Sequence, residues 1–244
     1  AEGKIFRISE VRDRTRSGII DFDNLLTRVM KGVDELYNNP NHSDVTGKPS
    51  GFIDLDQKTA GMHDGELIII AGRPSMGKTS FAMNIAENVL LDDESDGAVL
   101  IFSLEMPGES LTTRLLSGMT KLNQQNVRSG MLKDDELRIL FKQSEKLKNM
   151  PLWIDDSSLL SPMELRAKAR RLARTEKAGL SLIVVDYLQL MQLPLSTENR
   201  VNQISEISRS LKSLAKELNV PVIALSQLNR AVEQRPNKRP IMAD

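Results

Sequence analysis

The stretch from residue 72 to residue 79, Gly-Arg-Pro-Ser-Met-Gly-Lys-Thr, constrains the fold of this chain more than any other. It fits the phosphate-binding loop pattern at every required position. Gly72 and Gly77 let the backbone curl so that successive N–H groups face phosphate oxygens. Lys78 supplies a positive charge for the β- and γ-phosphates, and the Thr79 hydroxyl is the expected ligand of Mg²⁺. The stretch therefore predicts a nucleoside triphosphate site.

The residues on either side of this stretch support the same interpretation. A run typical of a buried strand, Glu66 to Ala71, precedes it, and Ser80 to Ala86 follow with apolar residues at helical spacing. A glycine turn without a ligand is the alternative, and this strand–loop–helix order disfavours it. The predicted phosphate-binding residues are Gly72, Arg73, Pro74, Ser75, Met76, Gly77, Lys78, Thr79 and Ser80.

Composition limits the classes of protein to which the chain can belong. Its 244 residues include 33 Lys plus Arg and 33 Asp plus Glu, so no charge excess indicates nucleic-acid binding, although a ring can line its pore with a few basic loops. The absence of cysteine excludes disulfides and thiolate metal sites. No signal peptide is evident, and the apolar runs are far shorter than the roughly 20 residues of a membrane span. We expect a soluble, cytoplasmic protein with no membrane partner.

The first fifty residues have a different organisation from the rest. Apolar residues from Phe22 to Tyr37 recur every three or four positions, which predicts a helix that Asp21 or Asp23 could cap. Its apolar face must pack on its own domain or on a neighbouring one, and the spacing alone does not decide between them. Residues 40–50 are polar and rich in turn formers, which is typical of a flexible linker.

Five short apolar runs alternate with helical patterns in the remainder of the chain. Strands buried on both faces have this character, so we predict an α/β fold: a mostly parallel, twisted sheet with helices on both faces. A capping box at Ser161 with Pro162 predicts a helix that continues to Gly179, and residues 201–218 predict a second helix. The five runs are Glu66 to Ala71, Ala98 to Ser103, Leu152 to Asp155, Leu182 to Asp186 and Pro221 to Ser226.

Polar side chains at three of these strand ends are the candidates for chemistry. Asp186 ends an apolar strand, as expected of the carboxylate that holds Mg²⁺ through water, although an aspartate could instead cap the next segment. Glu105 follows another strand and is the candidate base for the attacking water, a role that spacing alone neither favours nor disfavours. Gln227 follows a third strand and could sense the γ-phosphate, but taken alone it is more typical of an ordinary loop glutamine.

Two basic clusters are candidates for nucleic-acid contacts. The cationic residues from Arg166 to Lys177 could form a phosphate track, but a solvated helix face is the better interpretation. Arg230, Arg235, Lys238 and Arg239 lie in a proline-containing tail and are the more plausible contacts, although charged tails are usually only solvated.

Four ordered motifs resemble those of the bacterial replicative DNA helicases of the DnaB type. They are Gly-Arg-Pro-Ser-Met-Gly-Lys-Thr (72–79), Phe-Ser-Leu-Glu-Met (102–106), Asp-Tyr-Leu-Gln-Leu-Met (186–191) and Ala-Leu-Ser-Gln-Leu-Asn-Arg (224–230). The resemblance implies a RecA-like P-loop ATPase domain that uses ATP and Mg²⁺ at the subunit interfaces of a homohexameric ring and translocates on single-stranded DNA. It also implies that Glu105 is the catalytic base, that Gln227 is the sensor, and that Lys78 takes part in catalysis.

The same resemblance implies an order of segments. Residues 1–20 are the N-terminal linker segment, 21–39 the linker helix that docks on a neighbouring subunit, 40–50 the flexible linker, and 51–244 the ATPase domain. Members of the family also carry an N-terminal domain that meets primase, and a DNA-binding loop and an arginine finger that fall beyond Asp244. We therefore expect a linker plus most of a motor domain, with primase and a helicase loader as partners of the full-length protein.

Two alternatives remain at this stage. One is a RecA-type recombinase or a clock-type ring ATPase, and the other is a module that uses ATP for assembly with little turnover. Glu105 discriminates against the second, because a module without turnover needs no base at that strand end.

Overall fold

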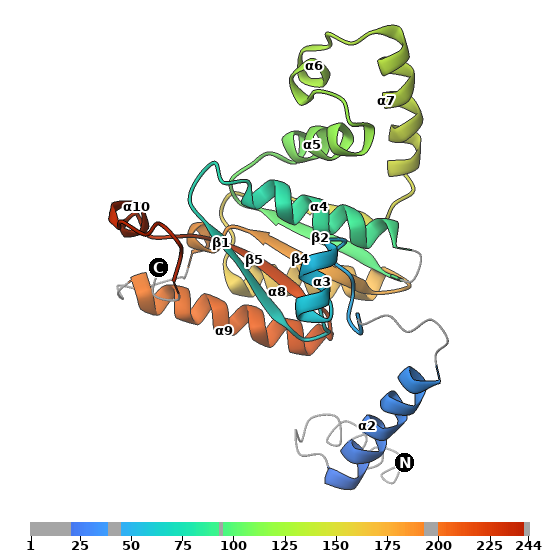
Figure 1. Ribbon diagram of the computed structural model, residues 1–244, viewed down its shortest axis with the longest axis vertical. Coiled ribbons are helices and arrows are strands. Elements are labelled where there is room, and N and C mark those ends of the chain that lie inside the picture. Colours follow the sequence, from blue (N-terminus) through green and yellow to red (C-terminus); the bar gives the residue numbers. More distant parts are fainter. Residues whose placement is uncertain (1–20, 39–44, 93–94, 193–199, 242–244) are drawn as a thin grey trace, which may run out of the picture. The chain divides into compact units, whose positions relative to one another are not determined.

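The computed structural model describes residues 21–38, 45–92, 95–192 and 200–241 (Figure 1). The chain divides into two units, Ala1–Asp44 and Val45–Asp244. The predicted linker segment 1–20 lies outside the described residues. The first residues of the second unit pack against the rest of that unit. The backbones of Lys48 and Met62 exchange two hydrogen bonds of 2.8 Å.

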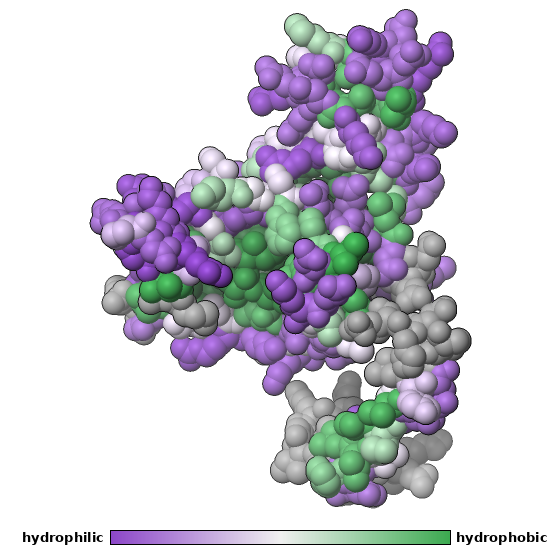
Figure 2. All heavy atoms as spheres, in the orientation of Figure 1, coloured by the Kyte–Doolittle hydropathy of each residue, from purple (hydrophilic) through white to green (hydrophobic). Residues whose placement is uncertain are grey.

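In the first unit, α2 (Phe22–Tyr37) has the predicted bounds. Asp21 immediately precedes the helix, and its carbonyl accepts from the amide of Leu25 at 3.2 Å, so Asp21 rather than Asp23 lies at the N-terminal boundary. The apolar face of α2 is exposed (Figure 2), with Val29 61% and Tyr37 78% accessible. The helix therefore carries an apolar stripe that no other described residue of the first unit covers.

The second unit is built on a five-stranded parallel sheet with the strand order β1-β5-β4-β2-β3. All five predicted strands are confirmed, and β2 and β3 have the predicted bounds. β4 begins two residues earlier than predicted, and β1 and β5 are each shifted by one residue. The strands are β1 (Leu67–Gly72), β2 (Ala98–Ser103), β3 (Leu152–Asp155), β4 (Leu180–Asp186) and β5 (Val222–Gln227).

Helices cover both faces of this sheet, and alternate side chains of the strands face opposite layers. On one face, α4 (Lys78–Leu91) and α5 (Gly108–Thr120) pack on a cluster that includes Val99 and Ile101. On the other face, α8 (Pro162–Thr175) and α9 (Arg200–Leu218) pack on a cluster that includes Leu100 and Phe102. Figure 1 shows α4 and α9 on opposite sides of the strands. The predicted α/β layering is confirmed.

The capping box of α8 is present as predicted, but the helix is shorter. The Ser161 side chain accepts from the amide of Glu164 at 3.3 Å, and the Glu164 carboxylate accepts from the amide of Ser161 at 2.9 Å. The helix ends at Thr175, not at Gly179, because Glu176 is extended and Gly179 adopts a positive φ of 74° that turns the chain into β4.

Three of the five cationic residues of α8 are engaged in ion pairs. Arg166 and Arg170 both donate to Glu217 of α9, the first from Nε at 2.7 Å, and Lys168 donates to Asp155 at 2.5 Å. These contacts tie α8 to α9 and to β3. They favour the interpretation of this surface as a helix face over a free phosphate track.

Several elements were not predicted. Between β2 and β3 the chain forms α5, α6 (Gln124–Ser129) and α7 (Asp134–Leu147), with α6 and α7 beyond α5 on the side away from the sheet (Figure 1). The others are α3 (Ile53–Thr59), the 3-10 turn η1 (Leu188–Leu190) and α10 (Ala231–Gln234). None of the helices in the described ranges is long and apolar enough to cross a membrane.

Candidate nucleotide-binding site

The predicted phosphate-binding loop joins the carboxyl end of β1 to the first turn of α4. Ser75 and Gly77 have positive φ values of 62° and 85°, and these two residues curl the loop so that α4 begins at Lys78. The unpaired amides of the first turn of α4 face the loop, and a helix N-terminus favours anions. A Cβ at Gly72 would lie 3.2 Å from Cγ of Lys78, so a side chain there would crowd the lysine.

Two side chains of α4 reach the predicted chemistry. The ammonium of Lys78 donates to the carbonyls of Gly72 at 2.9 Å and Arg73 at 3.3 Å, which holds it over the loop. The hydroxyl of Thr79 donates to Oδ2 of Asp186 at 2.7 Å. The hydroxyl and the carboxylate predicted to hold Mg²⁺ are therefore direct neighbours.

Parallel pairing brings the other candidates to the same edge of the sheet. Gln227 is the register partner of Gly72, and Asp186 is the register partner of Ser103. The amide of Leu104 donates to the carbonyl of Asp186 at 2.7 Å, which carries Glu105 around the end of β2. Four strands thus bring the predicted site to one edge of the sheet. β1 carries the phosphate-binding loop, and β2, β4 and β5 lead to Glu105, Asp186 and Gln227.

A cavity of about 380 Å³ lies at this edge. Asp186 is 3% exposed, and its contact with Thr79 places it directly beneath the cavity wall. The lining residues are Pro74, Ser75, Gly77, Lys78, Thr79, Ser80, Glu105, Met106, Arg114, Tyr187 and Gln227. Eight of them belong to the predicted site.

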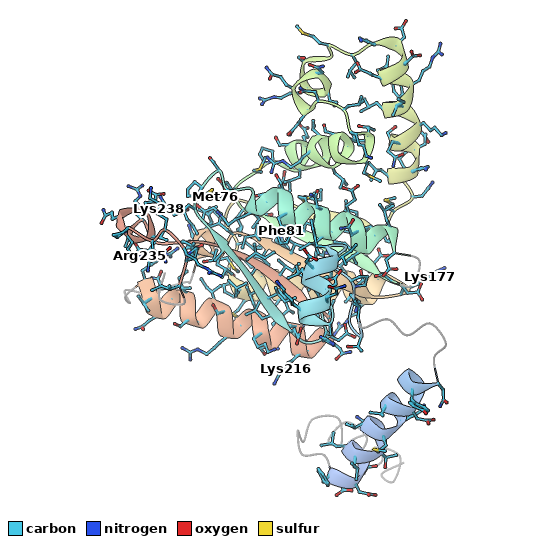
Figure 3. The ribbon with its side chains drawn as sticks, viewed as in Figure 1. Met76, Phe81, Lys177, Lys216, Arg235 and Lys238 are labelled. Atoms are coloured by element: carbon cyan, nitrogen blue, oxygen red, sulfur yellow. The ribbon has the colours of Figure 1, made fainter. Side chains whose placement is uncertain are left out.

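Three predicted loop residues do not line the cavity. Gly72 ends β1 behind the loop. Met76 is 76% exposed at the loop and is labelled in Figure 3. Arg73 donates from Nε to Glu233 at 2.6 Å and from Nη1 to the carbonyl of Leu228 at 2.9 Å, so its side chain joins the loop to the segment after β5.

Electrostatics single out Asp186 within the site. Burial raises the pKa of its carboxyl, and the negative charge of Glu105 raises it further. The hydrogen bond from Thr79 and the positive charges of Lys78 and Arg114 oppose this rise without cancelling it. A buried carboxylate whose charged form is disfavoured gains from a cation placed beside it.

Arg114 and Tyr187 are cavity residues that sequence reasoning missed. Arg114 comes from α5, an unpredicted helix, and no local pattern distinguishes it from the other arginines. Tyr187 follows Asp186 directly, and burial together with the charges of Glu105 and Asp186 raises the pKa of its phenol. Its position next to the predicted strand-end residue Asp186 was the one sequence feature that could have indicated a place in the cavity.

The residues fit Mg²⁺ bound together with a nucleotide. Mg²⁺ takes oxygen ligands in an octahedron, and nucleotide sites typically supply one or two from protein and the others from phosphates and water. The Thr79 hydroxyl would supply one such oxygen, and the Asp186 carboxylate, 2.7 Å from that hydroxyl, would bind a water of the metal. Over the described ranges, no group of three or more His, Cys, Asp or Glu residues could hold a metal ion by itself, which agrees with a site that the nucleotide must complete.

Comparisons with known proteins point to one family. The family described as the DnaB-like helicase C-terminal domain matches residues 47–244. The chain is 50% identical over 245 residues to the replicative DNA helicase DnaB of Buchnera aphidicola subsp. Acyrthosiphon pisum (strain APS), covering 100% of the chain and 52% of that protein. It is 47% identical over 251 residues to the DnaB of Haemophilus influenzae (strain ATCC 51907 / DSM 11121 / KW20 / Rd), again covering 100% of the chain and 52% of that protein. The chain thus spans about half the length of the curated relatives it matches.

Solved structures agree with this result. The ATPase domain of G40P superposes with a TM-score of 0.84 at 35% identity, over 92% of this chain and 77% of that one. A DnaB-like replicative helicase, described together with its interactions with primase, superposes with a TM-score of 0.80 at 34% identity, over 97% of this chain and 56% of that one. The fold is therefore that of a RecA-like ATPase domain, and the chain belongs to the DnaB-like helicase C-terminal domain family.

Proposed function

We propose that this chain is the ATP-hydrolysing motor of a replicative DNA helicase. One observation carries the proposal: Glu105, Lys78 and Gln227 line one cavity at the end of a parallel sheet, above the contacting pair Thr79 and Asp186. A loop for phosphates alone would bind a nucleotide. The exposed carboxylate of Glu105 beside it adds a side chain of the type that serves as a base for the attacking water.

The residues divide the work of phosphoryl transfer to water. The loop amides and Lys78 bind and orient the β- and γ-phosphates of ATP, and Thr79 and Asp186 hold Mg²⁺, the latter through water. When bound, Mg²⁺ neutralises charge on the phosphates. Glu105 orients the attacking water and accepts its proton. Gln227 detects the γ-phosphate through its amide, and Arg114 adds a positive charge to the same cavity.

Partners of the whole protein follow from the same assignment. We infer a homohexameric ring in which each ATP lies between two subunits, and in which the exposed apolar face of α2 docks on the neighbouring subunit. Single-stranded DNA passes through the ring, and primase and a loader meet the full-length protein. Support comes from the names of the relatives and from the DnaB-like helicase whose structure describes interactions with primase.

The decisive test is Glu105→Gln in the full-length protein. The amide keeps the shape of the side chain but cannot accept a proton, so hydrolysis should fall by roughly 10² to 10⁴ while ATP binding persists. The assay measures ATP hydrolysis with and without single-stranded DNA, alongside the affinity for ATP.

Glu109→Gln is the matched control, because Glu109 lies exposed on α5, four residues away along the chain. It should leave hydrolysis unchanged. Equal losses of ATP affinity and of hydrolysis in Glu105→Gln would assign Glu105 a structural role and refute the proposed mechanism.

A further inference from the structure

β5 is longer than its pairing with β4. The β4–β5 register runs from Ile183↔Val222 to Val185↔Ala224, whereas β5 continues to Gln227. On its other side β5 stays paired with β1 as far as Gly72↔Gln227. The last residues of β5 therefore have a strand neighbour on one side only, at the point where the chain supplies a residue to the nucleotide cavity.

The side chain of Gln189 takes the place of the missing strand. Its Oε1 accepts from the backbone amide of Gln227 at 3.3 Å, and its Nε2 donates to the carbonyl of Gln227 at 3.2 Å and to Oγ of Ser226 at 2.9 Å. A primary amide carries the same donor and acceptor groups as a peptide bond. Gln189 thus satisfies both backbone groups of Gln227, as a neighbouring strand would.

Gln189 is held by β4 on one side and by a contact with α9 on the other. It lies in η1, which follows Asp186 and Tyr187 directly. Its carbonyl accepts from Nη2 of Arg200, in the first turn of α9, and Nη1 of Arg200 donates to Oε1 of Gln203 at 2.8 Å. The contacts form a chain from the cavity through Gln227 and Gln189 to the start of α9.

We propose that Gln189 is a positioning residue that fixes the backbone of Gln227 and so sets where the Gln227 side chain lies at the cavity. The inference rests on the proposed role of Gln227 as the γ-phosphate sensor. A side chain can detect one phosphate only if its backbone does not shift, since misplacement by about 1 Å costs on the order of a hundredfold in rate. Gln189 acts on the reaction only through Gln227.

The test compares Gln189→Leu, Gln227→Leu and the double variant in the full-length protein. Leu has nearly the volume of Gln but neither donates nor accepts, so Gln189→Leu should lower kcat by about tenfold or more and leave the KM for ATP and the Kd of ADP unchanged. The double variant should have the kcat of Gln227→Leu alone, because the two residues act as one unit. Amide exchange at Gln227 should be faster in Gln189→Leu.

Two further variants serve as controls for this interpretation. Gln192→Leu is the matched control, because Gln192 is exposed in the same connection, and it should leave kcat unchanged. Gln189→Glu keeps the acceptor for the Gln227 amide but loses both Nε2 donations and sets a carboxylate oxygen against the Gln227 carbonyl, so kcat should fall in this variant too. This variant carries the test if Gln189→Leu does not fold.

The outcomes separate this inference from the proposed function. If Gln227→Leu lowers kcat and Gln189→Leu does not, the positioning role is refuted and the sensor role stands. Additive losses in the double variant would also refute the positioning role, because Gln189 would then act by another route. If Gln227→Leu leaves kcat unchanged, the sensor role fails, and the inference fails with it.

Discussion

The buried carboxylate of Asp186 should lower the free energy of unfolding of the nucleotide-free protein, relative to a neutral side chain at the same position. Asp186 is 3% exposed, and burial and Glu105 raise the pKa of its carboxyl. Its side-chain partner, the Thr79 hydroxyl at 2.7 Å, donates equally well to an amide oxygen. Asp186→Asn removes the buried charge and keeps that bond. We expect a gain of about 1 kcal/mol in the free energy of unfolding, typical of relieving such a site, which raises Tm by about 2 to 4 °C in a domain of this size.

The sign of the pH dependence follows from the direction of the shift. Because the folded-state pKa of Asp186 lies above its unfolded value, the ionised carboxylate opposes folding at neutral pH. This cost shrinks as the pH falls below the folded pKa and is gone below the unfolded pKa. The advantage of Asp186→Asn should therefore shrink in acid. Thermal unfolding in EDTA at several pH values measures it.

Mg²⁺ and a non-hydrolysable ATP analogue should reverse the order of stability. At a hundred times Kd, a ligand adds about 2.7 kcal/mol to the wild type. The variant lacks the carboxylate proposed to hold Mg²⁺, so it should gain less. Asp155→Asn is the control of opposite sign: burial raises the pKa of Asp155, but hydrogen bonds from Lys168 and Ser157 outweigh that effect and lower it, so the substitution should destabilise. An unchanged or lower Tm of Asp186→Asn in EDTA would refute the reasoning.

Three other substitutions test the remaining assignments. Lys78→Ala should abolish ATP turnover without lowering Tm, because the lysine lies at the loop and not in the core; a folded variant with full activity in an ATPase assay would contradict the loop assignment. The double variant Leu26→Asp, Val29→Asp should dissociate the ring and lower ATPase activity, with nearly unchanged Tm of the isolated domain. Light scattering measures the size of the assembly. Rings that persist while the monomer melts at a far lower temperature would show that the helix packs on its own subunit. Glu217→Gln should lower stability by about 1 kcal/mol at pH 7, since two arginines bind the carboxylate and lower its pKa. That difference in stability from the wild type should vanish in acid as the pH falls through the lowered pKa. The control Glu206→Gln should show no such loss. A difference that persisted in acid would exclude the ion pairs as its cause.

The sheet and the phosphate loop could be predicted because their signals are local. All residues of β2 are buried, and a strand covered on both faces must be apolar along its whole length, so its bounds match its apolar run. β3 lies at the sheet edge and is only partly buried, but its short run of Leu152, Trp153 and Ile154 is apolar and marks the same bounds. The helix α2 has an apolar residue every three or four positions, and its bounds are also as predicted. In each case the residues that fix the element lie within it.

The elements between β2 and β3 gave no comparable signal. α7 has no buried residue and three acidic residues in its first turn, so its sequence resembles any solvated segment. α6 has six residues and buries none of them. Stability in this region comes from contacts between α5, α6 and α7, which a pattern within one helix does not reveal.

Within the site, residues that act through tertiary contacts were beyond prediction. Arg114 reaches the cavity only because α5 packs beside α4. Arg73 fits the loop pattern, yet its guanidinium binds Glu233, 160 positions further along the chain. Gln189 lies in a recognised motif, but its function depends on β4 and β5 separating at Val185 and Ala224.

The phosphate loop is carried by β1, which in the described sheet has a hydrogen-bonded neighbour on one side only. β2 and β4 lie between two neighbours, and almost all their residues are buried. Peeling β1 from β5 breaks a single ladder, as does peeling β3 from β2 at the opposite edge, whereas releasing β4 breaks two. The edge strands therefore open at a lower free energy than the central strands. Nucleotide exchange could therefore use a local opening of this margin while the central strands remain closed. A bound triphosphate would contact the loop at the end of β1 and would then stabilise this edge strand against opening.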